Sequence, residues 1–241
     1  MNIANTAALV TGASRGLGAA LAKELAARGA RVALVAREPD ALDAVVRDIR
    51  GAGGTAFALP ADVGDKDAVY PLAASAAELV GPLDLLIHNA SSLGPTPLRL
   101  LLDTECEDLE RVLSVNLIGP FRLSRAIAGS MAVRRTGTIV HLSSDAAVNA
   151  YSRWGAYSVS KAALDHLSRV WAEELAPFGV RVLAFDPGEM NTVMHREALP
   201  DADPTTLSDP AHVARRLISA LTDPSVPTGA RLTADGFQEA S

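Results

Sequence analysis

The sequence predicts an α/β protein of one domain, in which helices cover both faces of a parallel sheet. Two observations carry this prediction. Strand and helix patterns alternate along the whole chain, and a glycine-rich turn joins the first strand to the first helix. The 241 residues are 49% hydrophobic and 21% charged, which suffices for one large core. Because no linker, low-complexity tract or repeat interrupts them, we expect residues 1–241 to form a single domain.

Apolar, β-branched runs are typical of buried strands, and six of them occur: Ala7–Val10, Val32–Ala36, Ala56–Leu59, Leu83–His88, Thr138–Leu142 and Val180–Phe185. Amphipathic stretches lie between them. Two examples are Leu17–Arg28 and Ala41–Arg50, which end at Gly29 and Gly51, both suitable C-terminal caps. Unbroken alternation of strand and helix implies a parallel sheet with helices on both faces.

Composition and charge exclude several classes of protein. The net charge of −6 argues against binding to nucleic acid or acidic membranes, which both require a basic face. The single cysteine, Cys106, cannot form an internal disulfide, which fits a reducing cytoplasm. There is no apolar run of membrane-spanning length, no signal-peptide pattern and no metal-ligand spacing among the five histidines. We therefore expect a cytoplasmic protein with a small-molecule partner and no metal.

The first chemical signal is the sequence TGASRGLG at residues 11–18, which follows a strand and opens a helix. Glycines permit a tight turn and close backbone approach, and the free N–H groups at a helix start attract phosphate. No Lys-Ser/Thr pair follows, so the turn is not a P-loop. Three residues separate Gly12 from Gly16, so it also differs from the usual dinucleotide spacing. A glycine-rich turn without a ligand is the alternative that this motif leaves open.

Further motifs lie in a consistent order along the chain. Asp62-Val63 follows the third strand, HNAS at residues 88–91 follows the fourth, and a Tyr-x-x-x-Lys pair lies far downstream. Together with TGxxxGxG, this order resembles the short-chain dehydrogenase/reductase family over essentially the whole chain. The resemblance implies a Rossmann-type doubly wound parallel sheet of about seven strands, with a closing strand near residues 228–236. A faint likeness to sepiapterin reductases is too short to name a pterin substrate.

The resemblance also implies a set of site residues. The catalytic residues would be Asn116, Ser144, Tyr157 and Lys161. The cofactor contacts would come from Gly12, Ser14, Arg15, Gly16, Leu17, Gly18, Arg37, Asp62, Val63, Asn89, Ala90, Ser91, Tyr157, Lys161, Pro187, Gly188, Met190 and Thr192. Ser91, His88 and Asp186 stand where the family usually has glycine, asparagine and asparagine. None of the three occupies a catalytic position, and we expect Asp186 to affect loop anchoring more than chemistry.

The Tyr157–Lys161 pair has a physical rationale. A free tyrosine has a pKa of about 10 and is a poor base at neutral pH. A fixed ammonium beside it, aided by an oxidised nicotinamide ring, would favour the phenolate, and residues four apart share one helix face. In the family the lysine also binds the nicotinamide ribose, the asparagine holds a relay water and the serine binds the substrate oxygen. Asp165 and His166, beside the lysine, are expected on other faces of the helix.

The cofactor preference depends on the end of the second strand. NAD-preferring sites place a carboxylate there, which repels a 2′-phosphate. This chain has Ala36 and Arg37 instead, and Arg15 lies in the glycine turn. Two guanidinium groups suit a doubly charged phosphate, so NADP(H) is favoured. Glu38 could instead turn inward and accept a hydrogen bond from the ribose, so NAD(H) is a possible cofactor as well. Two solvated surface arginines are the alternative reading.

The substrate pocket is expected to be mainly apolar, with Arg153 and Glu189 as polar groups. Its predicted residues are Leu93, Gly94, Ala146, Val148, Trp154, Glu189, Met190 and others of the segment Glu189–Pro210, either a mobile loop over the site or a plain connection. Small ketones, quinones, fatty-acyl carbonyls and steroids all remain open as substrates. Two functions follow: an NADPH-dependent carbonyl reductase, or a catalytically idle NADP(H) sensor on the same scaffold. The resemblance implies a homodimer or homotetramer, with a dimer contact formed by the Tyr157 helix and the helix near Val112–Met131.

Overall fold

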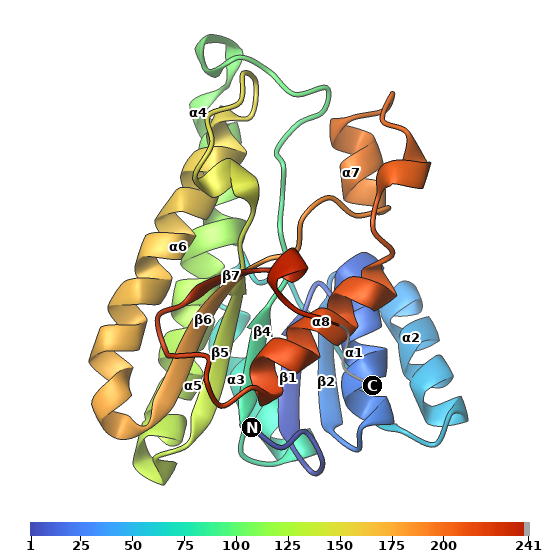
Figure 1. The fold of residues 1–241 in the computed structure, drawn as a ribbon, viewed down its shortest axis with the longest axis vertical. Coiled ribbons are helices and arrows are strands. Elements are labelled where there is room, and N and C mark those ends of the chain that lie inside the picture. Colours follow the sequence, from blue (N-terminus) through green and yellow to red (C-terminus); the bar gives the residue numbers. More distant parts are fainter. Residues whose placement is uncertain (239–241) are drawn as a thin grey trace.

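The computed structural model of the protein describes residues 1–238. Glu239–Ser241, at the end of the predicted domain, lie outside the described residues. One sheet contains seven parallel strands in the order β3-β2-β1-β4-β5-β6-β7 (Figure 1). The strands are β1 (Ala7–Thr11), β2 (Arg31–Ala36), β3 (Thr55–Pro60), β4 (Leu85–His88), β5 (Gly137–Leu142), β6 (Val180–Asp186) and β7 (Arg231–Thr233). The predicted doubly wound α/β fold is confirmed, including its closing strand.

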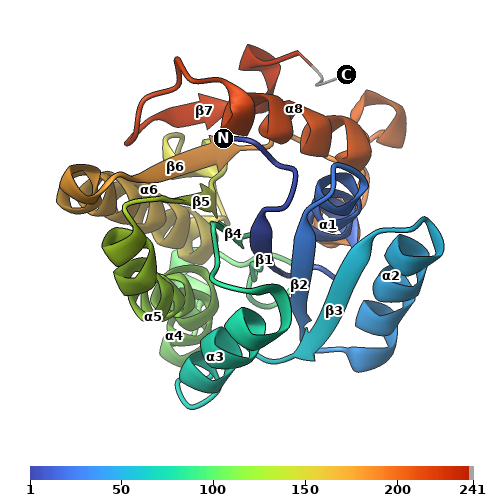
Figure 2. The ribbon, with the colours of Figure 1, turned by 90° about the horizontal axis from the view of Figure 1, so that it is seen from below.

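Helices cover both faces of this sheet. They are α1 (Gly16–Ala27), α2 (Pro39–Gly51), α3 (Val69–Val80), α4 (Cys106–Leu113), α5 (Gly119–Arg134), α6 (Gly155–Leu175), α7 (Val193–Ala198) and α8 (Pro210–Thr222). Figure 2 shows α1, α2 and α8 on one face and α3, α4, α5 and α6 on the other. The side chains of β1 alternate between two cores: Ala8 and Val10 belong to the first, Ala7 and Leu9 to the second.

The two predicted glycine caps have different outcomes. Gly29 has a φ of +86° directly after α1, as a helix-ending glycine should. Gly51, in contrast, is the last residue of α2, and the left-handed turn falls at Gly53, with a φ of +83°. Pro39 at the first turn also starts this helix two residues before the predicted Ala41. The cap at Gly51 was therefore wrong, because the helix continues until a glycine can reverse the chain.

The connection between α4 and α5 has an unusual geometry. Ser114–Ile118 form a π-helical turn between the two helices, and Asn116 is buried at its centre. Such turns are rare in proteins overall, but those that occur are often found at functional sites, because they alter the direction of side chains on one helix face. The predicted helix near Val112–Met131 is thus interrupted where the predicted catalytic asparagine lies.

The carboxyl ends of the strands position the site. Strand β1 pairs with β2 along one edge and with β4 along its other edge, so the strand order reverses direction at β1. In a doubly wound sheet a crevice forms beyond the strand ends at such a point. The segment Glu189–Pro210 lies beyond the same ends and is partly helical, since it contains α7 (Figure 1). A parallel bridge between Met190 and Ser208 joins its two ends. The segment is therefore a folded cover rather than a plain connection.

None of the helices within residues 1–238 combines the length and apolar character that a membrane span requires.

Candidate active site

The glycine turn after β1 packs directly against the end of β4. A Cβ atom on Gly12, which has a φ of +67°, would lie 2.8 Å from Cα of Ala90. The side-chain amide of Asn89 donates hydrogen bonds to the carbonyl oxygens of Thr11 (2.9 Å) and Gly12 (3.1 Å). Gly18 packs behind Gly12, where any side chain would meet the Gly12 carbonyl. Glycine is therefore required at positions 12 and 18, because the backbone approaches too closely for a side chain. The start of α1 lies beside this turn, and the free N–H groups of a helix start can bind a phosphate.

A cleft of about 360 Å³ extends from this turn across the ends of β2, β3 and β4. Most of the predicted cofactor residues line it: Gly12, Ser14, Arg15, Gly16, Leu17, Arg37, Asp62, Val63, Asn89, Ala90, Ser91, Met190 and Thr192. Tyr157, Pro187 and Gly188 line the adjoining cavity. Gly18 and Lys161 lie on neither wall, Gly18 behind the turn and Lys161 buried beneath the site.

Arg15 and Arg37 lie at the rim of the cleft, both exposed. The guanidinium of Arg37 is 3.6 Å from the carboxylate of Glu38, and both side chains are more than half exposed. Glu38 thus pairs with its neighbour in this structure. The shape of the cleft and its glycine wall fit a dinucleotide.

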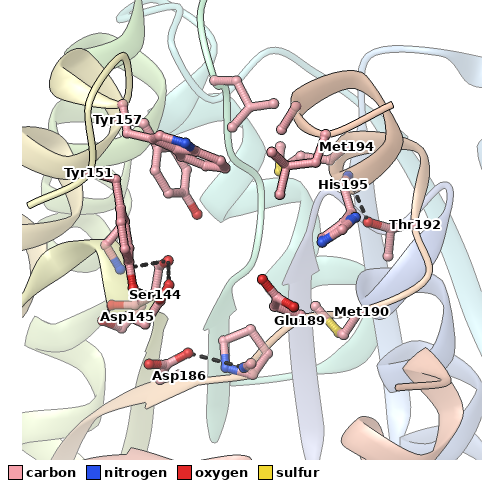
Figure 3. Close-up of a pocket in the computed structure, with 18 of the residues that line it drawn as sticks. Ser144, Asp145, Tyr151, Tyr157, Asp186, Glu189, Met190, Thr192, Met194 and His195 are labelled. Atoms are coloured by element: carbon pink, nitrogen blue, oxygen red, sulfur yellow. Dashed lines mark hydrogen bonds between the residues drawn. The ribbon is translucent and has the colours of Figure 1, made fainter. Parts of the chain in front are cut away.

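Tyr157 and Lys161 lie one turn apart near the start of α6, and both are buried. Nζ of Lys161 donates a 2.6 Å hydrogen bond to the carbonyl oxygen of Leu142, the last residue of β5, and lies 5.5 Å from the Tyr157 ring centre. In Figure 3 the phenol of Tyr157 points into the cavity, with Ser144 on the same side of it. The Ser144 hydroxyl donates to Asp145 (3.0 Å) and accepts from the backbone N–H of Ala146 (3.1 Å).

Asn116 braces this arrangement from the π turn. Its Oδ1 accepts from the N–H of Ser92 (2.7 Å), and its amide donates to the Ser92 carbonyl (2.8 Å) and to the Ser160 hydroxyl (2.9 Å). That hydroxyl in turn donates to the carbonyl of Tyr157 (2.6 Å). Ser91, where the family has glycine, also donates to Asn116 (3.3 Å). The Asn116 side chain is therefore engaged with the protein and connects the end of β4 to α6.

Burial dominates the electrostatics of the tyrosine–lysine pair. Burial raises the pKa of Tyr157 to about 12, aided by Asp186 and Asp145 and opposed by hydrogen bonds from Ser144 and Ser91. Burial also lowers the pKa of Lys161 to about 8, against the opposing effect of Asp165 and Asp186. The sequence predicted a lowered pKa for Tyr157. The direction is opposite in the protein alone, because desolvation by burial is the largest influence on the pKa of the phenol.

The predicted position of Asp165 was wrong, and no pattern in the sequence indicated Arg231. Asp165 is buried one turn after Lys161 and accepts a 2.8 Å bond from Arg231, so it faces the site side of α6, not another face. His166, in contrast, is exposed as expected. Asp186 anchors its loop by accepting from the N–H of Gly188 (3.0 Å), but it also contacts Arg231 and raises the pKa of Tyr157. Its departure from the family pattern was the one available signal for this cluster.

A cavity of about 730 Å³ opens beside Tyr157 and continues into the glycine-lined cleft. Its residues include five of those predicted, namely Leu93, Ala146, Trp154, Glu189 and Met190. Three predictions were wrong. Gly94 lines the cofactor cleft, Val148 is 65% exposed and lies off the cavity wall, and Arg153 borders a separate small pocket. These residues lie in loops, whose direction the sequence pattern does not determine.

His195 of α7 is a further polar residue on this wall, and no motif in the sequence indicated it. Figure 3 shows its ring on the cavity side of α7, above Glu189. Both ring nitrogens are shielded from solvent and have no hydrogen-bond partner within the described chain. Buried polar atoms normally have partners, so this ring has unused hydrogen-bonding capacity beside the cavity.

The fold and this site together define a class: a Rossmann-type oxidoreductase with a nucleotide cleft and an adjoining reaction cavity. Residues 6–203 match the family described as short chain dehydrogenase, and the chain belongs to that family. It is 35% identical over 239 residues to a 3-oxoacyl-[acyl-carrier-protein] reductase of Synechocystis sp., covering 95% of each chain.

Solved structures of the family have the same fold. A metagenomic short-chain oxidoreductase in complex with NADP is 32% identical, with a TM-score of 0.81 over 97% of this chain and 100% of that chain. An NAD⁺-bound xylitol dehydrogenase is 27% identical, with a TM-score of 0.86 over 97% of this chain and 98% of the other. Relatives of this chain therefore bind either nicotinamide cofactor.

Proposed function

We propose that this protein is an NADP(H)-dependent oxidoreductase that transfers hydride between the nicotinamide and a carbonyl or secondary alcohol of a small, largely apolar substrate. We further propose that it acts in the cytoplasm as a homodimer or homotetramer. One observation carries the enzymatic proposal: the phenol of Tyr157 and the hydroxyl of Ser144 face one cavity that continues into the glycine-lined cleft. A site with this geometry can hold a substrate oxygen beside a bound nicotinamide.

Each of the four predicted catalytic residues has a distinct role in this proposal. Tyr157 donates a proton to the carbonyl oxygen during reduction and accepts it during oxidation. Ser144 donates a hydrogen bond to the same oxygen and stabilises its developing charge. Lys161 supplies a buried cation beside the phenol, and Asn116 positions Ser92 and Tyr157 through its hydrogen bonds. The bound nicotinamide supplies or accepts the hydride.

The proposed preference for NADP(H) rests on the two exposed arginines at the rim of the cleft. Arg15 and Arg37 can both approach a 2′-phosphate, and Ala36 at the end of β2 brings no carboxylate to repel it. Glu38 pairs with Arg37, so a rotation that breaks this exposed pair would be required for it to serve a ribose hydroxyl. NAD(H) remains a weaker alternative cofactor.

The cavity wall supports a substrate without negative charge. Leu93, Ala146, Trp154, Met194 and Leu199 supply apolar surface. Its charged groups are carboxylates, those of Asp145, Asp186, Glu189 and Asp235, and no lysine or arginine is among the described residues that line it. An anionic substrate would meet repulsion without a compensating cation. We therefore infer a neutral or cationic carbonyl compound, with Glu189 and His195 as polar partners.

The function is tested by NADPH oxidation with a library of carbonyl compounds, with Tyr157→Phe as the blank. We expect turnover of neutral ketones, and a loss of about 10²–10⁴-fold in Tyr157→Phe with NADPH affinity retained, because only the transferable proton is removed. A loss below about tenfold would contradict the role of Tyr157. Micromolar NADPH binding without turnover of any carbonyl would instead favour the NADP(H) sensor.

A further inference from the structure

Arg231, the first residue of β7, binds three groups around the catalytic residues. Its Nε donates to Asp165 (2.8 Å), and its Nη2 donates both to Asp186 (2.9 Å) and to the carbonyl oxygen of Ser144 (2.8 Å). These partners belong to α6, to the end of β6 and to the loop after β5. One side chain on a three-residue strand therefore joins three segments that are far apart in the sequence.

Each partner is adjacent to a part of the site. Asp165 follows Lys161 by one helical turn on the same side of α6. Asp186 holds the turn at Gly188 with its other carboxylate oxygen. The Ser144 carbonyl belongs to the residue whose hydroxyl faces the cavity. A shift of any partner would change the position of the ammonium, of the turn beneath the cavity or of the serine hydroxyl.

The cluster is nearly closed to solvent, so its charges matter. The side chains of Asp165 and Asp186 are 6% and 7% exposed, and that of Arg231 is 22% exposed. A buried carboxylate without a partner is costly, whereas a guanidinium can bind two carboxylates and a carbonyl with one planar set of donors. Arg231 stays positively charged in this cluster. Desolvation lowers its pKa, but Asp165 and Asp186 outweigh that effect and the net pKa is raised.

Several other titratable groups surround the phenol and the ammonium. Asp165 and Asp186 favour the charged form of Lys161, and Asp186 and Asp145 disfavour the phenolate of Tyr157. His141 of β5 also faces Lys161, and burial lowers its pKa to about 3, so it is neutral and contributes no countercharge. Arg231 is therefore the cation that compensates the two buried carboxylates next to the catalytic pair.

We propose that Arg231 is a positioning residue of the catalytic site, which holds Ser144 in place and offsets the negative charge of Asp165 and Asp186 beside Tyr157 and Lys161. This inference rests on the proposed oxidoreductase function for its kinetic consequences. Its structural part concerns the charge around the phenol and can be measured without turnover.

The test is the variant Arg231→Gln, alone and combined with Asp186→Asn. Removal of the Arg231 cation leaves the carboxylates of Asp165 and Asp186 without their ion-pair partner. Their negative charge then raises the pKa of the Tyr157 phenol and the pKa of the Lys161 ammonium. We expect kcat to fall about tenfold to a hundredfold through displacement of Ser144, with a smaller change in KM for NADPH. In the oxidative direction, the limb on which activity rises with pH should move to higher pH. Addition of Asp186→Asn should move that limb back.

Arg134→Gln is the matched control. Arg134 likewise binds a carboxylate, that of Asp84 (2.7 Å), and a backbone carbonyl, that of Leu83, but it does so at the amino end of β4. We expect this variant to lose stability without any shift in the pH profile.

Two further variants apply if Arg231→Gln fails to fold. The triple variant Arg231→Gln, Asp165→Asn, Asp186→Asn keeps polar side chains of similar size but removes all three charges. Arg231→Lys keeps the positive charge but removes the planar guanidinium that binds several partners at once. The triple variant should then show a near wild-type pH limb with a reduced kcat.

A readout independent of turnover separates this inference from the proposed function. Ultraviolet titration of the phenol in the presence of NADP⁺, with Tyr157→Phe subtracted, should show a higher pKa for Tyr157 in Arg231→Gln and a reversal with Asp186→Asn. That shift in a protein without carbonyl turnover would sustain the inference while the proposed function fails. An active wild type whose kcat, pH limb and phenol titration are all unchanged by Arg231→Gln would overturn it.

Discussion

At the scale of single residues, the site depends on short polar contacts that burial strengthens. The Ser160 hydroxyl, for example, accepts from Asn116 and donates to the Tyr157 carbonyl, so the two predicted catalytic residues are joined by one buried side chain. Tyr157 itself has a raised pKa of about 12 in the protein alone. Such a phenol is protonated at neutral pH, which is the state that a proton donor in carbonyl reduction requires.

The cofactor preference can be tested at a single residue. Arg37→Asp removes one attraction for a 2′-phosphate and adds a repulsion, so the ratio of kcat/KM for NADPH to that for NADH should fall sharply and could invert. Because Arg37 is 63% exposed and pairs only weakly with Glu38, the fold should be unaffected. The measurement is kcat/KM with both cofactors. Arg37→Gln is the control, because it removes the positive charge without adding a negative one, and thermal unfolding checks that the fold is intact. Equal values for the two cofactors in the wild type would contradict the NADP(H) proposal.

At the scale of elements, the π turn between α4 and α5 determines where Asn116 points. A continuous α-helix through Ser114–Ile118 would rotate the following residues, whereas the wider turn directs the asparagine at Ser92 and α6. The folded segment Glu189–Pro210 acts at the same scale. Its helix α7 carries Met194 and His195 to the cavity wall, opposite Tyr151 and Ser144 (Figure 3).

The π turn leads to a prediction on stability and catalysis together. Asn116→Ala removes the partners of the Ser92 backbone and the Ser160 hydroxyl, and we expect it to cost about 2–3 kcal/mol of unfolding free energy. The kcat should also fall, because the turn that carries Tyr157 loses its brace. Urea unfolding and steady-state kinetics measure the two effects. Asn2→Ala, at an exposed asparagine that accepts from the Ala4 N–H, is the control and should change neither.

At the scale of the whole molecule, two buried histidines connect adjacent strands at the centre of the sheet. The rings of His88 and His141 stack with centroids 4.9 Å apart, and each bonds a serine of a covering helix, Ser124 or Ser168. Burial lowers both pKa values, that of His141 to about 3. The folded protein therefore keeps both rings neutral at pH values where the unfolded chain binds protons.

This difference predicts a loss of stability in mild acid. The histidine contribution is fully present well above the unfolded pKa of about 6.5 and is lost as the pH falls toward the folded pKa. For His141, whose folded pKa is about 3, the loss should be about 1.6 kcal/mol between pH 6.5 and 5. Urea unfolding at several pH values checks the slope. His141→Leu should flatten it, whereas replacement of the exposed His166 by Gln should leave it unchanged. An unaltered slope in His141→Leu would contradict the assignment.

The proposed homo-oligomer is also tested at this scale. Large apolar side chains are exposed on α5 and α6, namely Phe121 (39%), Val159 (52%) and Val170 (41%). The double change Val159→Asp, Val170→Asp would bury two charges in a contact formed by these helices, so we expect a monomer by light scattering where the wild type is a dimer or tetramer. Tyr70→Asp, on the exposed part of α3, is the control. A monomeric wild type would refute the proposed assembly.

Much of the fold and of the candidate site could be predicted because the decisive signals are local. The strand runs, the glycine turn and the Tyr-x-x-x-Lys spacing are read within a few residues, and parallel strands bring their carboxyl ends together by topology alone. Loop residues were harder to place. Val148 and Arg153 were expected in the cavity but lie off its wall, since no periodic pattern fixes the direction of a loop side chain.

The sequence by itself determined the alternation of strands and helices and the glycine turn, and it predicted Asn116, Ser144, Tyr157 and Lys161 as the catalytic residues. Only the tertiary structure decided the charge around them. Asp165, Asp186 and Arg231 are separated by tens of residues and meet only when α6, β6 and β7 pack together. The pKa of Tyr157 likewise rises because burial outweighs the nearby ammonium, and burial is a property of the packed molecule that no spacing in the chain encodes.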